Sequence, residues 1–342
     1  MRAAILRDFK APLTFEEVAR PAPDANDVLI LVEGCGVCHS DLHVADGDWP
    51  QIVPITKKPL ILGHEIVGRV TEVGSMVRNL RVGDRVGVAW LQWTCGECEF
   101  CREGNENLCI RQKITGVTQD GGYAEFAKAP ASHALKIPEA LSSFEAAPLF
   151  CAGLTVFRAL KRAKIQAGQR LAVFGVGGLG HLAVQIGKRL GAIVTAIDVS
   201  DEKLNHAKAL GASVALNSSA INVVKELRRV GSVHAALVTS AAKAAYDTAL
   251  PCIRPGGKLL VVGLPAEPLC FPSILMAALE IRIQATSVGT REDMRELLAL
   301  AADRKVRCQV ATRPLSQANE VFAELRAGKV AGRIVLIPDR RR

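Results

Sequence analysis

The sequence predicts an α/β protein of two domains: a β-rich domain and a domain built on a doubly wound parallel sheet. Its 342 residues exceed what most single hydrophobic cores hold. Up to about residue 151, short alternating or β-branched runs are separated by glycine, proline and aspartate. Beyond that point, apolar strand-like runs alternate with segments of helical periodicity, which is typical of a parallel sheet covered by helices.

Short strands are expected in the β-rich part, and their irregular spacing fits a barrel-like fold that turns at glycines. These strands are expected within residues 1–6, 27–37, 65–74 and 83–90. A helix over 291–305 and a strand over 331–337 follow near the end of the chain. We expect this tail to return to the first domain.

The α/β part shows a regular alternation. Strands are expected over 169–176, 192–198, 213–217, 233–240, 257–264 and 280–289, and helices over 178–191, 200–211, 220–231 and 244–253. Ser200 is the expected N-cap of its helix, because a serine hydroxyl accepts a hydrogen bond from a free N–H of the first turn.

Composition argues against several classes of protein. The net charge is +9 and the pI about 9.1, but no basic stripe or aromatic RNA motif is present, so we expect no nucleic-acid partner. The run 340–342 is expected to be a solvated tail. The N-terminus lacks the apolar core of a signal peptide, and glycines interrupt the most apolar stretch, 171–186. We expect a cytoplasmic protein without a membrane partner.

Ten cysteines are present, and four of them lie in the segment CGECEFCREGNENLC. Four thiolates at this spacing predict a closed tetrahedral Zn²⁺ site, which has a structural role. An iron–sulfur site is an open alternative, because spacing alone does not exclude it. The four expected ligands are Cys95, Cys98, Cys101 and Cys109.

A second set of ligand types consists of Cys38, His64 and Cys151. One histidine and two cysteines form a catalytic zinc set, which leaves the fourth coordination position for water or substrate. The three residues are far apart in sequence, so spacing alone also allows ordinary buried residues. The remaining cysteines, which we expect to be small buried apolar residues, are Cys35, Cys252, Cys270 and Cys308.

The segment GVGGLG, with Gly175, Gly177 and Gly180, fits the dinucleotide fingerprint G-x-G-x-x-G. It lies between an expected strand and an expected helix, and Asp198 ends the next strand, as a Rossmann nucleotide site requires. The helix N-terminus would receive the pyrophosphate. Asp198 favours NAD, because a carboxylate accepts hydrogen bonds from ribose hydroxyls and repels the 2′-phosphate of NADP.

Together these motifs resemble the zinc-dependent medium-chain alcohol dehydrogenases, most closely the tetrameric bacterial and yeast type of ethanol dehydrogenase. The resemblance spans the chain and rests on GVCHSDLHVADGDWP, GHEIVGRVTEVG, RVGDRVGVAW, GGYAEF, CAGLTVFRALK, GVGGLGHLAVQ, VVGLP, SVGTR and GRIVL. It implies a GroES-like catalytic domain over 1–151 and 288–342, with a zinc lobe at about 93–111, and a Rossmann NAD-binding domain over 152–287.

The resemblance also implies roles near the catalytic metal, for which Cys38, His64 and Cys151 resemble the ligands. Glu65 resembles an acid close to the metal that exchanges with water on it. Asp41 resembles the carboxylate that orients the zinc-bound histidine. Ser40 and His43 resemble a proton relay that includes a cofactor ribose hydroxyl.

Further roles implied by the resemblance concern the cofactor. His39 and Arg333 resemble residues that contact the pyrophosphate, Lys203 a lysine near the adenosine ribose, and Thr155 a residue packed against the nicotinamide. The other positions that match the family's cofactor site are Gly178, Leu179, Val262 and Leu264.

Trp49 and Trp90 resemble aromatic residues that narrow the substrate pocket, which favours short primary alcohols; packing in the core is the alternative role. The segments PQIVPITKKPLIL and AEPLCFPSILMA depart from the family pattern, in the pocket and in a subunit-contact region. The expected assembly is a homotetramer or homodimer. Aryl-alcohol, polyol and secondary-alcohol dehydrogenases remain alternatives, as do a zinc-free quinone or enoyl reductase and a zinc-stabilised nucleic-acid binder.

Overall fold

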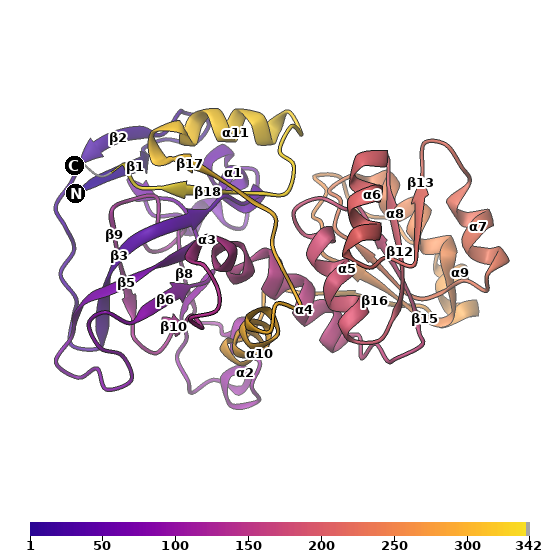
Figure 1. The fold of residues 1–342 in the computed structure, drawn as a ribbon, viewed down its shortest axis with the longest axis horizontal. Helices are drawn as coiled ribbons and strands as arrows, with labels where there is room; N and C mark the ends of the chain where they lie inside the picture. Colours follow the sequence, from indigo (N-terminus) through magenta and orange to yellow (C-terminus); the bar gives the residue numbers. More distant parts are fainter. Residues whose placement is uncertain (340–342) are drawn as a thin grey trace. The chain divides into compact units, whose positions relative to one another are not determined.

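The computed structural model describes residues 1–339, so the basic run 340–342 lies outside the described residues. The chain forms two compact units (Figure 1). The first contains Met1–Leu154, Thr290–Arg304 and residues 308–339. The second contains Thr155–Gly289 and Lys305–Arg307.

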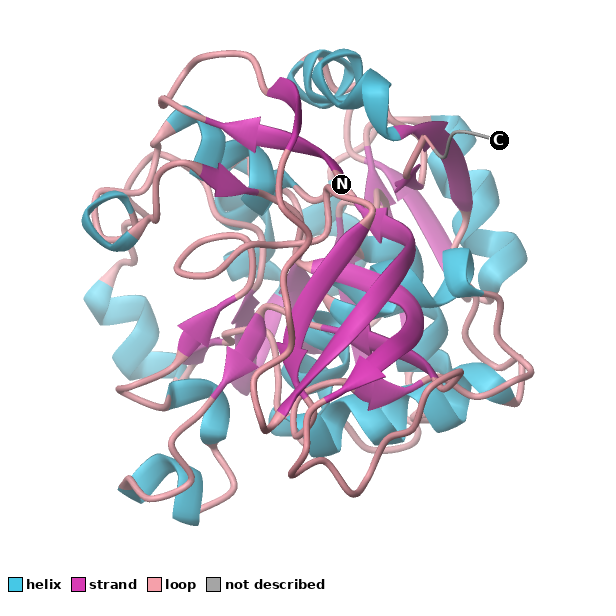
Figure 2. Cartoon of the chain, turned by 90° about the vertical axis from the view of Figure 1, so that its left-hand side faces the viewer, coloured by secondary structure: helices cyan, strands magenta, loops and turns pink. Residues whose placement is uncertain are grey.

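Strands dominate the first unit (Figure 2). They form a three-stranded sheet (β2-β1-β4), a seven-stranded sheet (β10-β6-β5-β3-β18-β17, with β9 also on β3) and the pair β7-β8. The strands are β1 (Arg2–Leu6), β2 (Thr14–Glu17), β3 (Asp27–Gly36), β4 (Leu60–Ile61), β5 (Glu65–Val73), β6 (Arg85–Val88), β7 (Leu91–Trp93), β8 (Lys113–Ile114), β9 (Phe126–Pro130), β10 (Leu135–Lys136), β17 (Val310–Pro314) and β18 (Arg333–Ile337).

The centre of the seven-stranded sheet brings three distant segments together. At the end of β3, Gly36 lies opposite Glu65 of β5 on one side and Val335 of β18 on the other. A Cβ atom on Gly36 would lie 1.9 Å from Glu65 Oε2, so only glycine fits this register. The C-terminal strand β18 therefore begins beside the segments that contain Cys38 and His64.

Short helices connect these strands. The α-helices are α1 (His39–Asp46), α2 (Glu99–Arg102), α3 (Ser143–Ala146), α10 (Arg291–Ala302) and α11 (Ala318–Arg326), and the 3-10 helices are η1 (Val53–Ile55), η2 (Glu106–Leu108), η3 (Ala147–Phe150) and η5 (Leu315–Gln317). Helix α1 begins with a capping box: the Cys38 Sγ accepts from Ser40 N and the Asp41 carboxylate accepts from Cys38 N. It ends at Gly47, whose φ of 66° closes the last turn.

The second unit is a six-stranded parallel sheet of order β13-β12-β11-β14-β15-β16. The order reverses at β11, which is the topology of a doubly wound sheet. Its strands are β11 (Arg170–Phe174), β12 (Ile193–Asp198), β13 (Val214–Asn217), β14 (Val233–Val238), β15 (Ile253–Val261) and β16 (Arg282–Ala285). Its helices are α5 (Gly180–Arg189), α6 (Asp201–Leu210), α7 (Val223–Arg229), α8 (Lys243–Ala249), η4 (Leu250–Cys252) and α9 (Ser273–Leu279), while α4 (Ala152–Arg162) begins in the first unit.

The predicted fold class is confirmed: a β-rich unit and a doubly wound parallel sheet occur in one chain. Ser200 caps α6, accepting a hydrogen bond from Lys203 N. All ten cysteines are free, but the expectation that Cys270 is buried was wrong. Cys270 lies in the loop between β15 and α9, outside the packed layers, and its side chain is exposed.

Among residues 1–339, no single helix is long and apolar enough to cross a membrane. Only the bent pair formed by Ser143–Phe150 and Ala152–Arg162 meets that criterion, by its combined length and composition.

Candidate active site

The four clustered cysteines converge in the loop between β7 and β8. The Sγ atoms of Cys95 and Cys101 are 3.9 Å apart, those of Cys98 and Cys101 3.5 Å, and those of Cys95 and Cys109 3.5 Å. A disulfide requires about 2.05 Å, whereas thiolates around a tetrahedral Zn²⁺ lie about 3.8 Å apart. Backbone N–H groups of Cys98 and Glu97 lower the pKa of Cys95 to about 6, which favours the thiolate that a metal binds.

Arg291 makes two contacts that hold this lobe in place and that the sequence analysis did not predict. Arg291, at the start of α10, forms a bidentate ion pair with Glu106 of η2, with Nη2–Oε2 at 2.5 Å and Nε–Oε1 at 2.9 Å. Arg291 also donates to the Ser132 carbonyl at 2.8 Å. The adjacent His133 is buried, and burial lowers its pKa to about 4, so it stays neutral in the packed interior.

The second ligand set also converges, although its members are far apart in sequence. The Sγ atoms of Cys38 and Cys151 are 3.9 Å apart, and ligand atoms of Cys38, His64, Glu65 and Cys151 all lie within 4.8 Å of one another. All four residues are buried. His64 Nε2 is buried without a hydrogen-bond partner in the described part of the chain. Two thiols and an unsatisfied imidazole nitrogen fit a zinc ion.

The local fold explains this convergence. Cys38 is the N-cap of α1, directly after β3, and His64 immediately precedes β5, the strand paired with β3. Cys151 follows η3, whose residues are all buried. A single sheet register and one buried turn therefore determine the positions of the three ligands.

The buried side chains of the cluster shift one another's pKa values. The hydrogen bond with Cys151 lowers the pKa of Cys38 well below its ordinary value against the opposing effect of burial, and His64 and Arg333 lower it further. Burial raises the pKa of Glu65 to about 7, although Arg333 opposes this shift. The Arg333 guanidinium donates to Glu65 Oε1, and both side chains are buried.

Behind His64 lies the carboxylate of Asp41. Its Oδ1 is 2.7 Å from His64 Nδ1, so the imidazole presents Nε2 to the cluster. Its Oδ2 accepts from Cys38 N at 2.9 Å and from the Tyr123 hydroxyl at 3.0 Å. Asp41 is 1% exposed, so these three donors are the principal compensation for burying its charge.

Helix α1 holds the predicted proton relay. Ser40 and His43 are three residues apart, which places them on one face of the helix. His43 Nδ1 is 2.9 Å from Asp48 Oδ2, and its ring lies 4.9 Å from that of Trp49. The sequence did not single out Asp48, whose contact depends on the turn after α1. His39 is exposed at the first position of the helix.

Trp90 contacts the ligand set directly. Its ring meets the His64 ring edge-on, with 4.9 Å between centroids and a 90° interplanar angle. Both Trp49 and Trp90 are half-buried and pack against the core of the first unit. Each tryptophan therefore combines core packing with a contact to a predicted site histidine.

In the second unit, each fingerprint glycine has its own geometry. Gly175 has φ of 89°, a conformation that favours glycine. A Cβ atom on Gly180 would lie 1.9 Å from the Gly175 carbonyl oxygen, whereas one on Gly177 would meet nothing within 4 Å. The loop is thus tight where the helix meets the strand and open at Gly177, as backbone approach to a pyrophosphate requires.

Asp198 ends β12 and is buried. Its Oδ2 accepts from Val176 N at 2.6 Å, and its Oδ1 accepts from Val199 N at 2.8 Å and Ser200 N at 3.1 Å. The carboxylate therefore joins the fingerprint loop to the start of α6. Other predicted cofactor positions of this unit are Thr155 in α4, Gly178 and Leu179 in the fingerprint loop, Lys203 in α6, and Val262 and Leu264 after β15.

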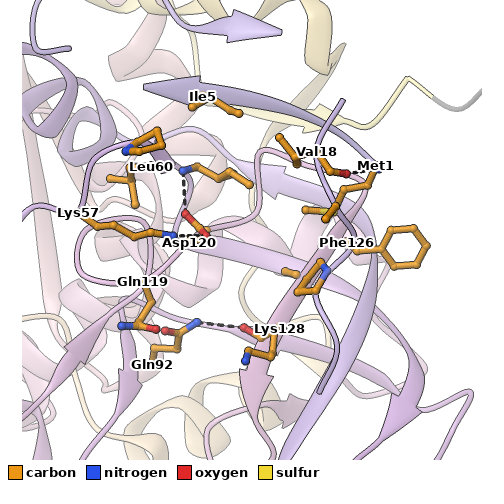
Figure 3. A pocket seen from close by; sticks show the side chains of 16 residues that line it. Met1, Ile5, Val18, Lys57, Leu60, Gln92, Gln119, Asp120, Phe126 and Lys128 are labelled. Carbon is orange, nitrogen blue, oxygen red and sulfur yellow. Dashed lines mark hydrogen bonds and ion pairs between the residues drawn. The ribbon is translucent and has the colours of Figure 1, made fainter. Parts of the chain in front are cut away.

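A separate hollow of about 360 Å³ lies in the first unit (Figure 3). Its walls include Leu60, Gln92, Gln119 and the ion pair of Lys57 with Asp120, at 2.5 Å. None of the predicted site residues lines it.

Comparison with known proteins is consistent with this geometry. Residues 24–139 match the family described as "Alcohol dehydrogenase GroES-like domain", and residues 178–303 match "Zinc-binding dehydrogenase". An alcohol dehydrogenase of Geobacillus stearothermophilus is 46% identical over 342 residues, covering 99% of this chain and 100% of that protein.

Solved structures of dehydrogenases and reductases resemble this fold along almost the whole chain. The alcohol dehydrogenase of Aeropyrum pernix superposes with a TM-score of 0.92 at 37% identity, covering 99% of this chain and 100% of that one. The acetophenone reductase of Geotrichum candidum, solved in complex with NAD, superposes with a TM-score of 0.90 at 30% identity, covering 98% of this chain and 96% of that one.

A β-rich unit with two clusters of metal-binding side chains, in one chain with a doubly wound sheet and a dinucleotide fingerprint, defines the class of zinc-binding dehydrogenases. This chain belongs to the zinc-dependent medium-chain alcohol dehydrogenase family. It is an oxidoreductase that transfers hydride between an alcohol and a nicotinamide cofactor.

Proposed function

We propose that this enzyme interconverts short primary alcohols and aldehydes with NAD, using one catalytic and one structural zinc ion per subunit. The catalytic domain corresponds to 1–151 with 288–342, and the NAD-binding domain to 152–287. The observation that carries the proposal is the buried cluster of Cys38, His64, Glu65 and Cys151, in which His64 Nε2 has no hydrogen-bond partner among the described residues. The four-cysteine lobe offers no open coordination position and has a structural role.

Residues of α1 would transfer the proton of the alcohol hydroxyl to solvent. A bound zinc ion would supply the Lewis acidity that lowers the pKa of the alcohol hydroxyl. Ser40 would take the hydroxyl proton and His43 would release it to solvent, and a bound cofactor would supply the ribose hydroxyl of this relay. Asp48 orients the His43 ring by its contact with Nδ1. Asp41 holds His64, and Glu65, paired with Arg333, is the acid nearest the metal ligands.

The second unit would hold the nicotinamide cofactor, which would supply the hydride acceptor for alcohol oxidation. Gly175, Gly177 and Gly180 shape the loop for the pyrophosphate. Asp198 would accept hydrogen bonds from the adenosine ribose and select NAD over NADP. Further cofactor contacts come from His39, Thr155, Gly178, Leu179, Lys203, Val262, Leu264 and Arg333.

We infer a homotetramer in the cytoplasm. Support for association comes from β16, an edge strand with exposed residues, and from nearby apolar side chains: Ile283 is 40% exposed and Ile274 of α9 is 79% exposed. Uncovered edge strands and apolar side chains favour pairing with a second copy. Ten free cysteines agree with a reducing compartment.

The two metal sites should respond differently to loss of one ligand. Replacing Cys38 by Ser should abolish turnover and remove about one zinc per subunit while the melting temperature changes little, since this cluster serves the reaction. Replacing Cys101 by Ser should chiefly lower the melting temperature, because a structural zinc contributes folding free energy. Metal analysis and thermal unfolding of both variants check this; reversed phenotypes would contradict the assignment.

Cofactor choice should depend on Asp198. We expect kcat/KM with NAD⁺ to exceed that with NADP⁺ by at least about 100-fold, because the 2′-phosphate would lie against a buried carboxylate. Asp198→Gly should narrow this ratio. Kinetics with both cofactors test the claim, and equal kcat/KM values in the unmodified enzyme would refute it.

Trp90 should limit substrate size. Trp90→Ala should raise kcat/KM for larger alcohols relative to ethanol. The gain should grow with chain length, because each methylene in an apolar pocket contributes about 1–3 kcal/mol of transition-state binding. A pure packing role predicts a loss of roughly 3–5 kcal/mol of stability with unchanged preference. Measuring an alcohol panel and the melting temperature on the same variant separates the two, and unchanged selectivity would count against the narrow pocket.

A further inference from the structure

Tyr123 is among the most deeply buried polar side chains near the ligand set. It lies in the segment before β9 and is 0% exposed. Its hydroxyl donates to Asp41 Oδ2 at 3.0 Å, and the other oxygen of that carboxylate contacts His64 Nδ1 at 2.7 Å. The hydroxyl is therefore two hydrogen bonds away from the imidazole that faces the metal ligands.

Both the backbone and the ring of Tyr123 are held in place. The backbone N–H of Tyr123 donates to the Leu62 carbonyl at 3.0 Å, and the Tyr123 carbonyl accepts from Ala4 N at 2.8 Å. A Cβ atom on Gly63, which has φ of 94°, would lie 2.4 Å from Cδ1 of the ring, so the ring occupies the space that this glycine leaves. Gly63 directly precedes His64. Tyr123 thus contacts both the backbone before the histidine and the carboxylate behind it.

The donors around Asp41 are divided between its two oxygens. Oδ2 accepts from Cys38 N at 2.9 Å and from the Tyr123 hydroxyl, which leaves Oδ1 for His64. Burial, and then the charge of Asp41, raise the pKa of Tyr123 well above its ordinary value, so the hydroxyl keeps its proton and remains a donor. Because donors from three different segments hold its two oxygens, the Asp41 carboxylate has little freedom to rotate.

We propose that Tyr123 is a positioning residue for the catalytic metal: its hydroxyl fixes the orientation of Asp41 and, through it, that of the His64 ring. The proposal rests on the proposed function of the Cys38, His64 and Cys151 cluster. Tyr123 touches neither substrate nor cofactor in this scheme. Outer partners of metal-bound histidines set ring orientation and ligand basicity, and their loss typically costs about 10–100-fold in metal affinity or activity.

The test is Tyr123→Phe, which removes the hydroxyl and keeps the ring. Zinc loss from the purified holoenzyme to an excess of chelator is followed with a metallochromic indicator. We expect release of the catalytic zinc to become faster by about 10-fold, near the lower end of the range for outer partners. Release of the zinc in the four-cysteine lobe should keep its rate. The cobalt-substituted variant should show shifted visible absorption bands, since the ligand field at the site changes.

Tyr246→Phe is the matched control. Tyr246 is 1% exposed, and its hydroxyl donates to the Gly263 carbonyl in the second unit. The same chemical change there should leave both zinc release rates unaltered, whatever it does to the melting temperature. If the Tyr123→Phe enzyme releases both zinc ions as slowly as the unmodified enzyme does, the hydroxyl has no positioning role and the proposal is overturned.

A double-mutant cycle tests the route through Asp41. If Tyr123 acts through Asp41, Tyr123→Phe should add little to the acceleration caused by Asp41→Asn. Fully additive effects would overturn the proposal. A different result would refute the proposed function itself: the unmodified protein would then release zinc only from the four-cysteine lobe.

Discussion

The buried carboxylate of Asp41 joins three segments that are distant in the sequence. It accepts from Cys38 N at the start of α1, from His64 Nδ1 before β5, and from the Tyr123 hydroxyl before β9. Burying a carboxylate without hydrogen-bond donors would cost much folding free energy, so the burial of Asp41 requires these three donors. The result is a histidine held among the ligand atoms of Cys38, Glu65 and Cys151, with an Nε2 that has no hydrogen-bond partner among residues 1–339.

The rest of the first unit serves to maintain this geometry. The register of β3 with β5 and β18 brings Cys38, Glu65 and Arg333 to one end of the sheet, where a bare Gly36 leaves room for the Glu65 carboxylate. The ion pair of Glu65 and Arg333 then stabilises a second charge inside the protein. A β-rich scaffold suits this task because a fixed register sets the positions of side chains that local sequence cannot bring together.

Much of this could be predicted from sequence, and the successes follow a physical rule. The four-cysteine lobe and the glycine fingerprint are local, so spacing alone indicates their chemistry. Cys38, His64 and Cys151 needed a family resemblance, because only the tertiary fold brings them together. The hydroxyl contact of Tyr123 and the carboxylate contact of Asp48 had no signal in their own neighbourhoods. Cys270 was misjudged because burial of cysteine is an average tendency that a surface loop overrides.

The most direct test of the central claim is anomalous diffraction at the zinc absorption edge from crystals of the purified enzyme. We expect a peak about 2.3 Å from the sulfurs of Cys38 and Cys151 and about 2.0–2.1 Å from His64 Nε2. A second peak is expected among the four cysteines of the lobe. An anomalous peak in the lobe alone, with His64 Nε2 bound to no metal, would contradict the central claim.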